Sequence, residues 1–462
     1  MPDASRLLTI AFAMAALCVP AAANAEAGDG HEAWQAPTLT ITRYDEDWSR
    51  LADPDARTGR WSEAFKYVPL DDSGTIWLST GVELRLRSES LSNNLWGDAA
   101  APDDSYVWAR AMPYADLHVG PIRAFVQPIA AYAVGVAPTA SPVDQTRVDL
   151  LQGFAEIDLG SVTLRGGRQM LSLGAERLIG TRYGPNVPLA FDGARADIRT
   201  GSATLSLLAV KPVQARPGAL DDRSSPTKAL WGVYAAMPGL DAYYLGYRNR
   251  QVTFGGVDGR EERHSLGLRA HGDAGDWSWN VEGVYQFGHF AGRAISAWTL
   301  GTEATRSFPD SPLSPRATMR FNIVSGDRNP DDRTLGTFNA LFPKGKYFGE
   351  LSPVGPYNIV NLNPSVTLSP GPDLTLTVAA MAYWRHSKAD GVYDIPGNLV
   401  RAPGNATGRF IGREAEASLS WQATPELELS TSLSAFVPGA FIRQTGSGKT
   451  ITMLGLESNF RF

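Results

Sequence analysis

The fold is decided by residues 76–87, which read IWLSTGVELRLR. The even-numbered positions of this stretch are mostly apolar, and the odd-numbered positions include Glu83, Arg85 and Arg87. A period of two places alternate side chains on opposite faces of a β-strand. The stretch therefore predicts a strand with one apolar face and one charged face.

The same alternation recurs along the chain and predicts roughly 18 strands in total. The further predicted strands are residues 107–119, 122–134, 148–159, 162–169, 191–199, 203–210, 230–237, 240–248, 265–270, 277–287, 294–301, 316–324, 360–368, 374–385, 411–421, 427–437 and 451–462.

The connections between these strands alternate in length. Short turns such as HVGPI and DLGSV take turns with long polar segments such as SESLSNNLWGDAAAPDDS. Outer-membrane barrels have short periplasmic turns and longer external loops, whereas both ends of a soluble sandwich face the same solvent. We therefore predict an all-β fold, a transmembrane antiparallel up-and-down β-barrel whose long loops are extracellular. The last strand ends on Phe460 and Phe462, in a pattern similar to the terminal strand of bacterial outer-membrane barrels.

Residues 1–25 have the pattern of a cleavable signal peptide. Arg6 precedes the apolar run LLTIAFAMAALCVPAAA, and small residues stand at Ala23 and Ala25. A lipoprotein signal is the weaker alternative, because Leu17 is large for the position before Cys18. We assign residues 26–74 to a periplasmic N-terminal segment and residues 75–462 to the barrel, located in the outer membrane of a Gram-negative cell.

Composition excludes several classes of protein. A net charge of −6 and a pI near 5.6 give no support for nucleic-acid binding. Beyond the signal peptide there is no apolar run of about 18 residues, so a transmembrane helix is not expected. The sole cysteine is Cys18, and the six histidines lack the spacing of a metal site, so the sequence predicts no disulfide, no metal and no cofactor.

One long loop, residues 325–350, reads SGDRNPDDRTLGTFNALFPKGKYFGE and follows neither the helical nor the strand period. Phe338, Phe342, Tyr347 and Phe348 need burial that this loop cannot provide by itself. We therefore expect the loop to fold into the barrel mouth, with these aromatics packed on the wall. Its charged residues are expected to face water: Asp327, Arg328, Asp331, Asp332 and Arg333.

This loop resembles the signature segment of the alginate export family of outer-membrane β-barrels. The blocks DEDWSRLADP, FKYVPL, STGVELRLRSE, GGRQMLSLGAERLIG, FDGARAD, GVYQFGHF, AYWRHSKADGVY and FIGREAEASLSW agree with it and span nearly all of the chain after the signal peptide. The resemblance implies a monomeric barrel of 18 strands through which, in the best-understood members, the anionic polyuronate alginate leaves the cell. The family is broad, so the substrate of one member does not fix that of another.

The strand register places charged side chains on the face that points away from lipid. The basic residues are Arg85, Arg87, Arg110, Arg123, Arg165, Arg195, Arg199, Arg269, Arg316, Arg320 and Arg385. The acidic residues are Glu83, Asp116, Glu156, Asp197, Glu282, Glu414, Glu416 and Glu428. Guanidinium groups pair with carboxylates, so one interpretation is an electropositive pore that binds an anionic polymer. The other interpretation is a set of cross-strand ion pairs that satisfy a polar interior, and both can hold together.

Aromatic residues near the predicted strand ends are typical of the girdles at the two bilayer interfaces. They are Trp77, Trp108, Tyr114, Trp231, Tyr243, Tyr244, Trp277, Trp279, Trp298, Trp384 and Trp421.

The sequence favours a channel that exports an anionic polysaccharide and carries out no chemistry. Two alternatives stay open: a general or substrate-specific porin for small anions or nutrients, and a barrel-embedded hydrolase built without a local motif. We expect outer-membrane lipid as a partner and no catalytic residues. Periplasmic export partners and metal ions bound in loops are also left open.

Overall fold

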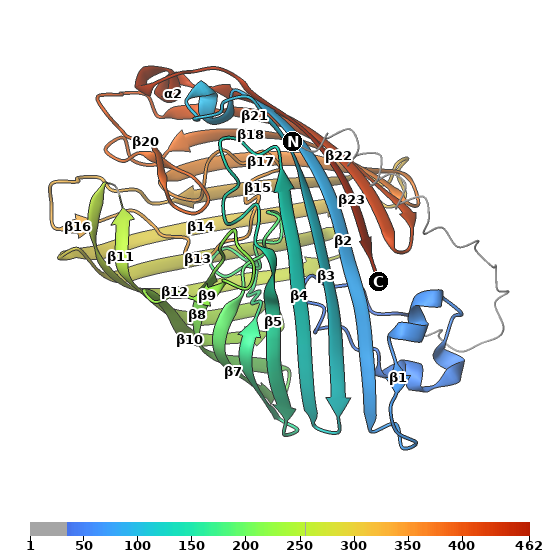
Figure 1. Cartoon of the computed structure of the whole chain (residues 1–462). Helices are drawn as coiled ribbons and strands as arrows, with labels where there is room; N and C mark the ends of the chain where they lie inside the picture. Colours follow the sequence, from blue (N-terminus) through green and yellow to red (C-terminus); the bar gives the residue numbers. More distant parts are fainter. Residues whose placement is uncertain (1–34, 255) are drawn as a thin grey trace.

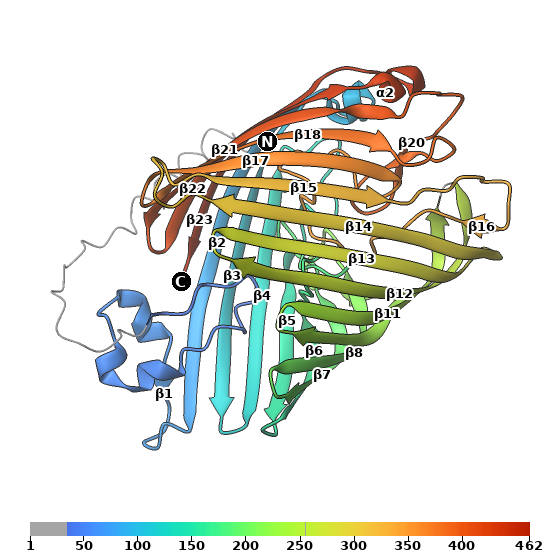
Figure 2. The ribbon, with the colours of Figure 1, turned by 180° about the vertical axis from the view of Figure 1, so that it is seen from behind.

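The protein is a closed barrel of 18 antiparallel strands (Figures 1 and 2). The structure is a computed structural model, and it describes residues 35–254 and 256–462. Each barrel strand pairs with its neighbours in chain order, and β2 pairs with β23 to close the ring. The barrel strands are β2 (Ile76–Ser92), β3 (Asp104–Val119), β4 (Ile122–Val134), β5 (Arg147–Asp158), β6 (Val162–Gln169), β7 (Phe191–Thr200), β8 (Ala203–Gln214), β10 (Lys228–Met237), β11 (Leu240–Phe254), β12 (Val257–Ala274), β13 (Trp277–Phe290), β14 (Arg293–Ser307), β15 (Arg316–Val324), β17 (Ile359–Gly371), β18 (Leu374–Arg385), β21 (Phe410–Thr424), β22 (Leu427–Pro438) and β23 (Ile451–Arg461).

The predicted fold and strand number are confirmed. Four predicted strands match at both ends, namely β4, β6, β15 and β18. The largest difference is β12, which was predicted over residues 265–270 and extends from Val257 to Ala274. Its outward-facing residues turn polar toward the external end, where the strand leaves the apolar part of the membrane, so the apolar period marks only the strand's middle.

The alternation along β2 follows the predicted faces. Glu83 and Arg85 are buried toward the lumen, whereas Leu84 between them is 46% exposed on the outer surface. Exposure of Leu84 is consistent with a barrel, because lipid replaces protein as the apolar neighbour.

The expected aromatic girdle is correct for part of the set. Trp277, Trp279, Trp298 and Trp421 are exposed on the outer surface. Trp108, Tyr114 and Tyr243 are buried on the lumen side instead, so their assignment to the girdle was wrong. A buried tyrosine needs a hydrogen-bond partner, and Tyr243 donates its hydroxyl to the carboxylate of Glu282.

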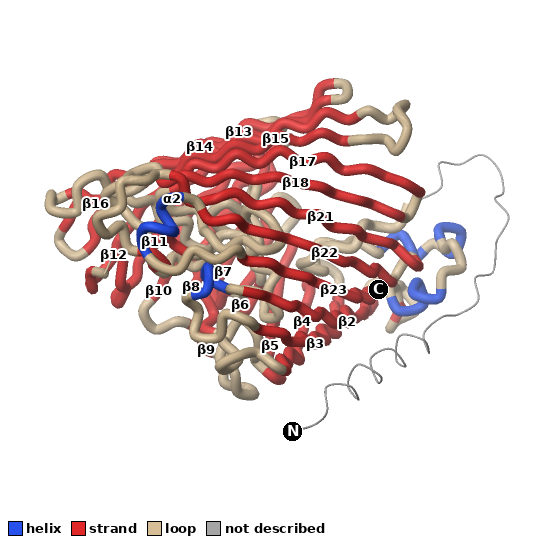
Figure 3. Tube along the Cα trace, turned by 90° about the horizontal axis from the view of Figure 1, so that it is seen from above, coloured by secondary structure: helices blue, strands red, loops and turns tan. Residues whose placement is uncertain are grey.

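Connections at the two ends of the barrel differ as predicted. Figure 3 shows the loops gathered at the end that carries α2 (Ala440–Thr445) and β16 (Thr334–Leu335), whereas short turns join the strands at the other end. This external end also contains η4 (Asn94–Gly97), β9 (Arg223–Ser224) and the small hairpin of β19 (Val392–Tyr393) and β20 (Leu399–Arg401). None of the helices in the described ranges is long and apolar enough to cross a membrane.

The N-terminal segment lies at the periplasmic end of the barrel (Figure 1). It contains three short 3-10 helices, η1 (Ser49–Ala52), η2 (Pro54–Ala56) and η3 (Trp61–Phe65), followed by β1 (Val68–Pro69). β1 pairs with the part of β2 that extends past the end of β23, and so covers an otherwise open strand edge. The predicted signal peptide lies outside the described residues.

Candidate transport channel

Two external loops fold back into the lumen and meet there. They are residues 170–190, between β6 and β7, and residues 325–358, between β15 and β17. The amide of Gly180 donates to the carbonyl of Phe342 at 2.8 Å, and the amide of Phe342 donates to the carbonyl of Leu178 at 2.9 Å. These backbone bonds hold the two loops to each other as one internal body.

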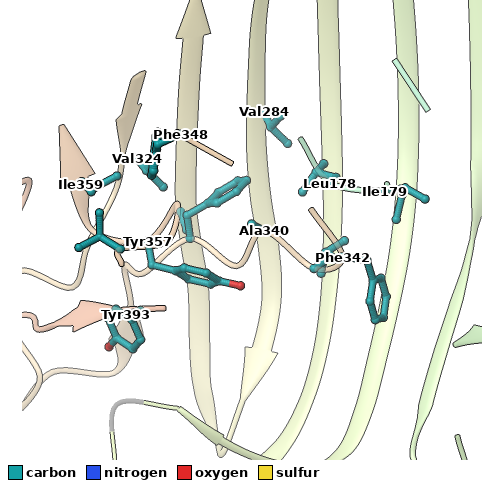
Figure 4. Close-up of a cluster of buried hydrophobic side chains, with 14 of the residues drawn as sticks. Leu178, Ile179, Val284, Val324, Ala340, Phe342, Phe348, Tyr357, Ile359 and Tyr393 are labelled. Atoms are coloured by element: carbon teal, nitrogen blue, oxygen red, sulfur yellow. The ribbon is translucent and has the colours of Figure 1, made fainter. Parts of the chain in front are cut away.

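Aromatic burial attaches the second loop to the wall, as predicted. Phe338, Phe342 and Phe348 are 2%, 4% and 3% exposed, and Tyr347 packs against the same cluster. Figure 4 shows Phe342 and Phe348 among apolar side chains from the wall and from the first loop. Burial of these rings stabilises the position of the loop inside the lumen.

One expectation about this loop was wrong. Asp327 was expected to face water, but it is buried, and its carboxylate pairs with the guanidinium of Arg293 at 2.7 Å. The neighbouring segment 328–333 is exposed, as expected. Asp327 therefore belongs to a buried ion pair, whereas the charged residues at 328–333 are exposed to solvent.

The predicted lumen arginines fall into three groups, and the first binds backbone carbonyls. Arg85 and Arg110 both donate to the carbonyl of Pro185 in the first inner loop, at 2.8 and 3.1 Å. Arg385 is buried and donates to four carbonyls of the external loop that follows β18. These guanidinium groups hold loops against the wall.

The second group forms ion pairs along the wall. Arg110 also pairs with Glu83 at 2.6 Å, and Arg87 contacts Glu89, Glu350 and Glu457. The remaining pairs are Arg123 with Asp116 and Glu156, Arg165 with Glu156, Arg195 with Asp197, and Arg269 with Asp241. The predicted ion-pair ladders are therefore present.

The third group is exposed on the lumen side near the periplasmic end. Arg320 pairs with Glu303 at 2.5 Å while both side chains stay about two-fifths exposed, and Arg199 pairs with Asp158 in the same manner. Arg316 is exposed and has no carboxylate within ion-pair distance among the described residues. These three arginines are the members of the predicted set that are exposed to solvent.

Four of the predicted carboxylates have other partners. Glu282 lies 3.2 Å from the guanidinium of Arg177, and Glu428 lies 3.8 Å from that of Arg461. Glu414 is buried and accepts a hydrogen bond from Tyr383. Glu416 accepts hydrogen bonds from the amide of Glu350 and the hydroxyl of Ser434. Contact of any of these residues with a substrate stays a prediction.

Sequence reasoning missed cations that reach the lumen from the inner loops. Arg177 donates to Asn322 at 2.7 Å and to the hydroxyl of Tyr347 at 3.1 Å. Its guanidinium occupies the space beside Gly301, where a Cβ atom would lie 2.1 Å from the guanidinium carbon. Loop residues have no strand period, so alternation along the strands could not place Arg177 in the lumen.

Lys344 is a second cation that an inner loop brings close to Arg177. Its amide donates to the carbonyl of Glu176 in the other inner loop at 3.0 Å. Burial lowers the pKa of Lys344, and the charges of Arg320 and Arg177 lower it further. A second lysine of the same loop, Lys346, pairs with Glu350. Because the charges of Arg177 and Arg320 act on Lys344, these three residues form a group of neighbouring cations where the inner loops meet the wall.

One group of carboxylates lies close enough together for a cation. Among the residues that the structure describes, donor atoms of Asp149, Asp221 and Asp222 lie within 4.8 Å of one another near the external end. Two of these residues already accept hydrogen bonds, Asp149 from the amide of Asp222 and Asp222 from Thr146. The cluster alone does not define a metal site.

Comparison with known proteins agrees with this architecture. The model of the alginate export family matches residues 76–453, so the chain belongs to the alginate export family. A sequence search of curated proteins found no match.

Solved structures share the fold at low sequence identity. One is Pseudomonas aeruginosa OccK2 in complex with glucuronate, with 13% identity, a TM-score of 0.57, and coverage of 86% of this chain and 99% of that one. Acinetobacter baumannii OccAB1 has 12% identity, a TM-score of 0.57, and coverage of 87% and 99%. Pseudomonas aeruginosa OpdK with vanillate has 12% identity, a TM-score of 0.57, and coverage of 83% and 98%. Family and fold together identify an outer-membrane β-barrel channel.

Proposed function

We propose that this channel exports an anionic polysaccharide such as alginate through a pore lined in part by arginine. In this proposal the barrel acts as a monomer in outer-membrane lipid and needs no cofactor. Periplasmic export partners stay open. Membership of the alginate export family supports the substrate class. The observation that carries the proposal is the cation group of Arg177, Arg320 and Lys344 inside the lumen.

The chemistry of this group suits a passing polyuronate. Guanidinium and ammonium groups attract carboxylates, and a water-filled lumen with low-dielectric walls strengthens that attraction. Conduction also requires each site to release its ligand. Glu303 beside Arg320 and Glu282 beside Arg177 weaken the attraction, so each uronate is held briefly and passed on.

The test is current block in a planar bilayer by a purified alginate oligosaccharide, with a neutral dextran oligosaccharide of equal length as the comparison. We expect the uronate to block the wild-type channel and the dextran to block it far less. The double variant R320Q/K344M should bind the uronate about tenfold more weakly. Arg177 is left in place because its pairing with Glu282 also holds the loop.

The matched control is R413Q, which removes an exposed arginine from the outer surface of β21. This variant should be blocked like the wild type. Equal block of R320Q/K344M and the wild type, with normal barrel assembly, would contradict the proposal.

A porin for small acids is the second candidate. Two structures that share the fold were solved with glucuronate and with vanillate, and both of these compounds are carboxylates. Flux into proteoliposomes separates the two functions: an exporter passes long alginate chains, whereas a porin of this kind passes monomeric glucuronate and excludes the polymer. For the hydrolase alternative we expect no turnover of a chromogenic ester.

A further inference from the structure

A second basic cluster lies outside the lumen, at the external ends of β11, β12 and β13. Arg248 and Arg250 on β11, Arg260 on β12 and His289 on β13 are all exposed. They line a surface hollow of about 730 Å³ together with Glu261, Glu262 and the β13–β14 turn. Figure 2 shows these three strands side by side on the barrel wall.

Strand register shows that this cluster faces the membrane side of the wall. Arg248 lies opposite Glu262, and Glu262 lies opposite His289, so the three form one row across neighbouring strands. Two positions along β12 toward the periplasm, His264 stacks on Tyr244 with ring centroids 5.9 Å apart. Two positions further, Leu266 is 50% exposed. The row is therefore the first fully polar one above an aromatic and apolar band.

The position of the row corresponds to the headgroups of the outer leaflet. Aromatic girdles mark the bilayer interface of outer-membrane barrels. Side chains directly above the girdle of Tyr244, His264 and Phe287 therefore lie at the level of the lipid headgroups. In the outer leaflet of an outer membrane these headgroups are phosphorylated sugars.

The arginines of the cluster are available for such a ligand. None of Arg248, Arg250 and Arg260 has a carboxylate within ion-pair distance in the described ranges, although ion pairs are frequent elsewhere in this barrel. Glu261 points to the lumen and pairs with Arg263 at 2.6 Å. Glu262 is the one acidic lining residue that faces outward, so positive charge is in excess.

We propose that Arg248, Arg250 and Arg260 bind the phosphate groups of an outer-leaflet glycolipid of the lipopolysaccharide type. Guanidinium groups bind phosphate in bidentate geometry and keep their charge at every relevant pH. The exposed Leu266 and Leu268 below the cluster provide the surface for the acyl chains of the same molecule. This combination favours a glycolipid over free phosphate, and it is independent of the transported substrate.

The experiment measures glycolipid binding to the purified full-length barrel by native mass spectrometry. The probes are phosphorylated lipid A, the same lipid A after enzymatic dephosphorylation, and inorganic phosphate. We expect wild-type protein to retain phosphorylated lipid A, and the variant R248Q/R250Q/R260Q to bind it at least about tenfold more weakly. The dephosphorylated lipid should also bind weakly, and inorganic phosphate at equal concentration should not displace lipid A.

The matched control is again R413Q, which removes an exposed outward arginine whose partners on the neighbouring strands are Ala382 and Val437, and it should bind lipid A like the wild type. Heat-modifiable gel migration and single-channel conductance verify that the triple variant is folded. Unchanged lipid A binding by a folded triple variant would overturn the proposal. Equal binding of the dephosphorylated lipid, or displacement by inorganic phosphate, would overturn it as well, by showing an apolar surface or a small-anion site.

Discussion

Two parts of the lumen wall carry arginines on the same face yet use them differently. On β2 and β3, Arg85 and Arg110 are buried under the inner loop of residues 170–190 and bind its carbonyls. On β15, Arg316 and Arg320 stay exposed. Strand alternation is the same in both places, so the segments that cover the wall decide which arginines are structural and which are accessible to a solute.

The strongest test of this comparison is the stability of the covered side. Replacing Arg110 by Met leaves the carboxylate of Glu83, which is 2% exposed, without its ion-pair partner. Breaking a buried pair in this way costs about 3–5 kcal/mol. We expect a large decrease in the urea concentration that unfolds R110M. R320Q breaks an exposed pair and should lose at most about 1 kcal/mol. Equal losses for the two variants would remove the distinction.

The second test concerns the other inner loop, residues 325–358. Replacing residues 339–346 by a Gly-Ser sequence of equal length removes the side chains of Phe342, Lys344 and Lys346, and with them the packing that holds the loop in the lumen. Single-channel conductance should rise severalfold. The same replacement at residues 328–333, an exposed part of the same loop, should leave conductance unchanged. A similar rise in both variants would show that loop flexibility, and not the buried contacts, sets the conductance.

Ion selectivity provides a smaller but more direct test. At low salt, R320Q should shift the reversal potential in a KCl gradient toward cation preference, because an accessible charge is lost and screening is weak. R316Q should have a similar effect. The same measurement of the reversal potential on R199Q tests an exposed arginine of β7 near the same end of the lumen. No shift in any of these variants would mean that ions pass away from this part of the wall.

The smallest expected effect is a pH dependence. An ordinary lysine loses its proton near pH 10.4, about the unperturbed value. Burial, Arg320 and Arg177 lower the pKa of Lys344, so it loses its charge at a lower pH than an ordinary lysine. Anion preference should therefore be complete below this lowered pKa and weaken as the pH rises through it. K344M should lack this step, and a step that persists in K344M would assign it to another group.

The sequence predicted the barrel well, since lipid on one side and a polar lumen on the other impose a period of two along the barrel strands. It also predicted the inward fold of the 325–350 loop from its aromatics. It could not find Arg177, because the position of a loop residue depends on the partner loop and on the space beside Gly301. Nor could the sequence show that Arg85 is buried and Arg320 exposed, because the exposure of each depends on segments distant in the chain.

The contacts of the N-terminal segment, finally, bear on the order in which the barrel closes and this segment docks. Arg43 donates to the carbonyl oxygen of Phe462, 419 positions away, and Trp61 packs against the ring of Phe462 with centroids 4.8 Å apart. β1 in turn needs the part of β2 that extends beyond β23. The segment thus contacts both the first barrel strand, through β1, and the end of the chain after the last strand, through Arg43 and Trp61. We therefore expect this segment to reach its native position only after the ring has closed, and a change in the fluorescence of Trp61 would report that docking.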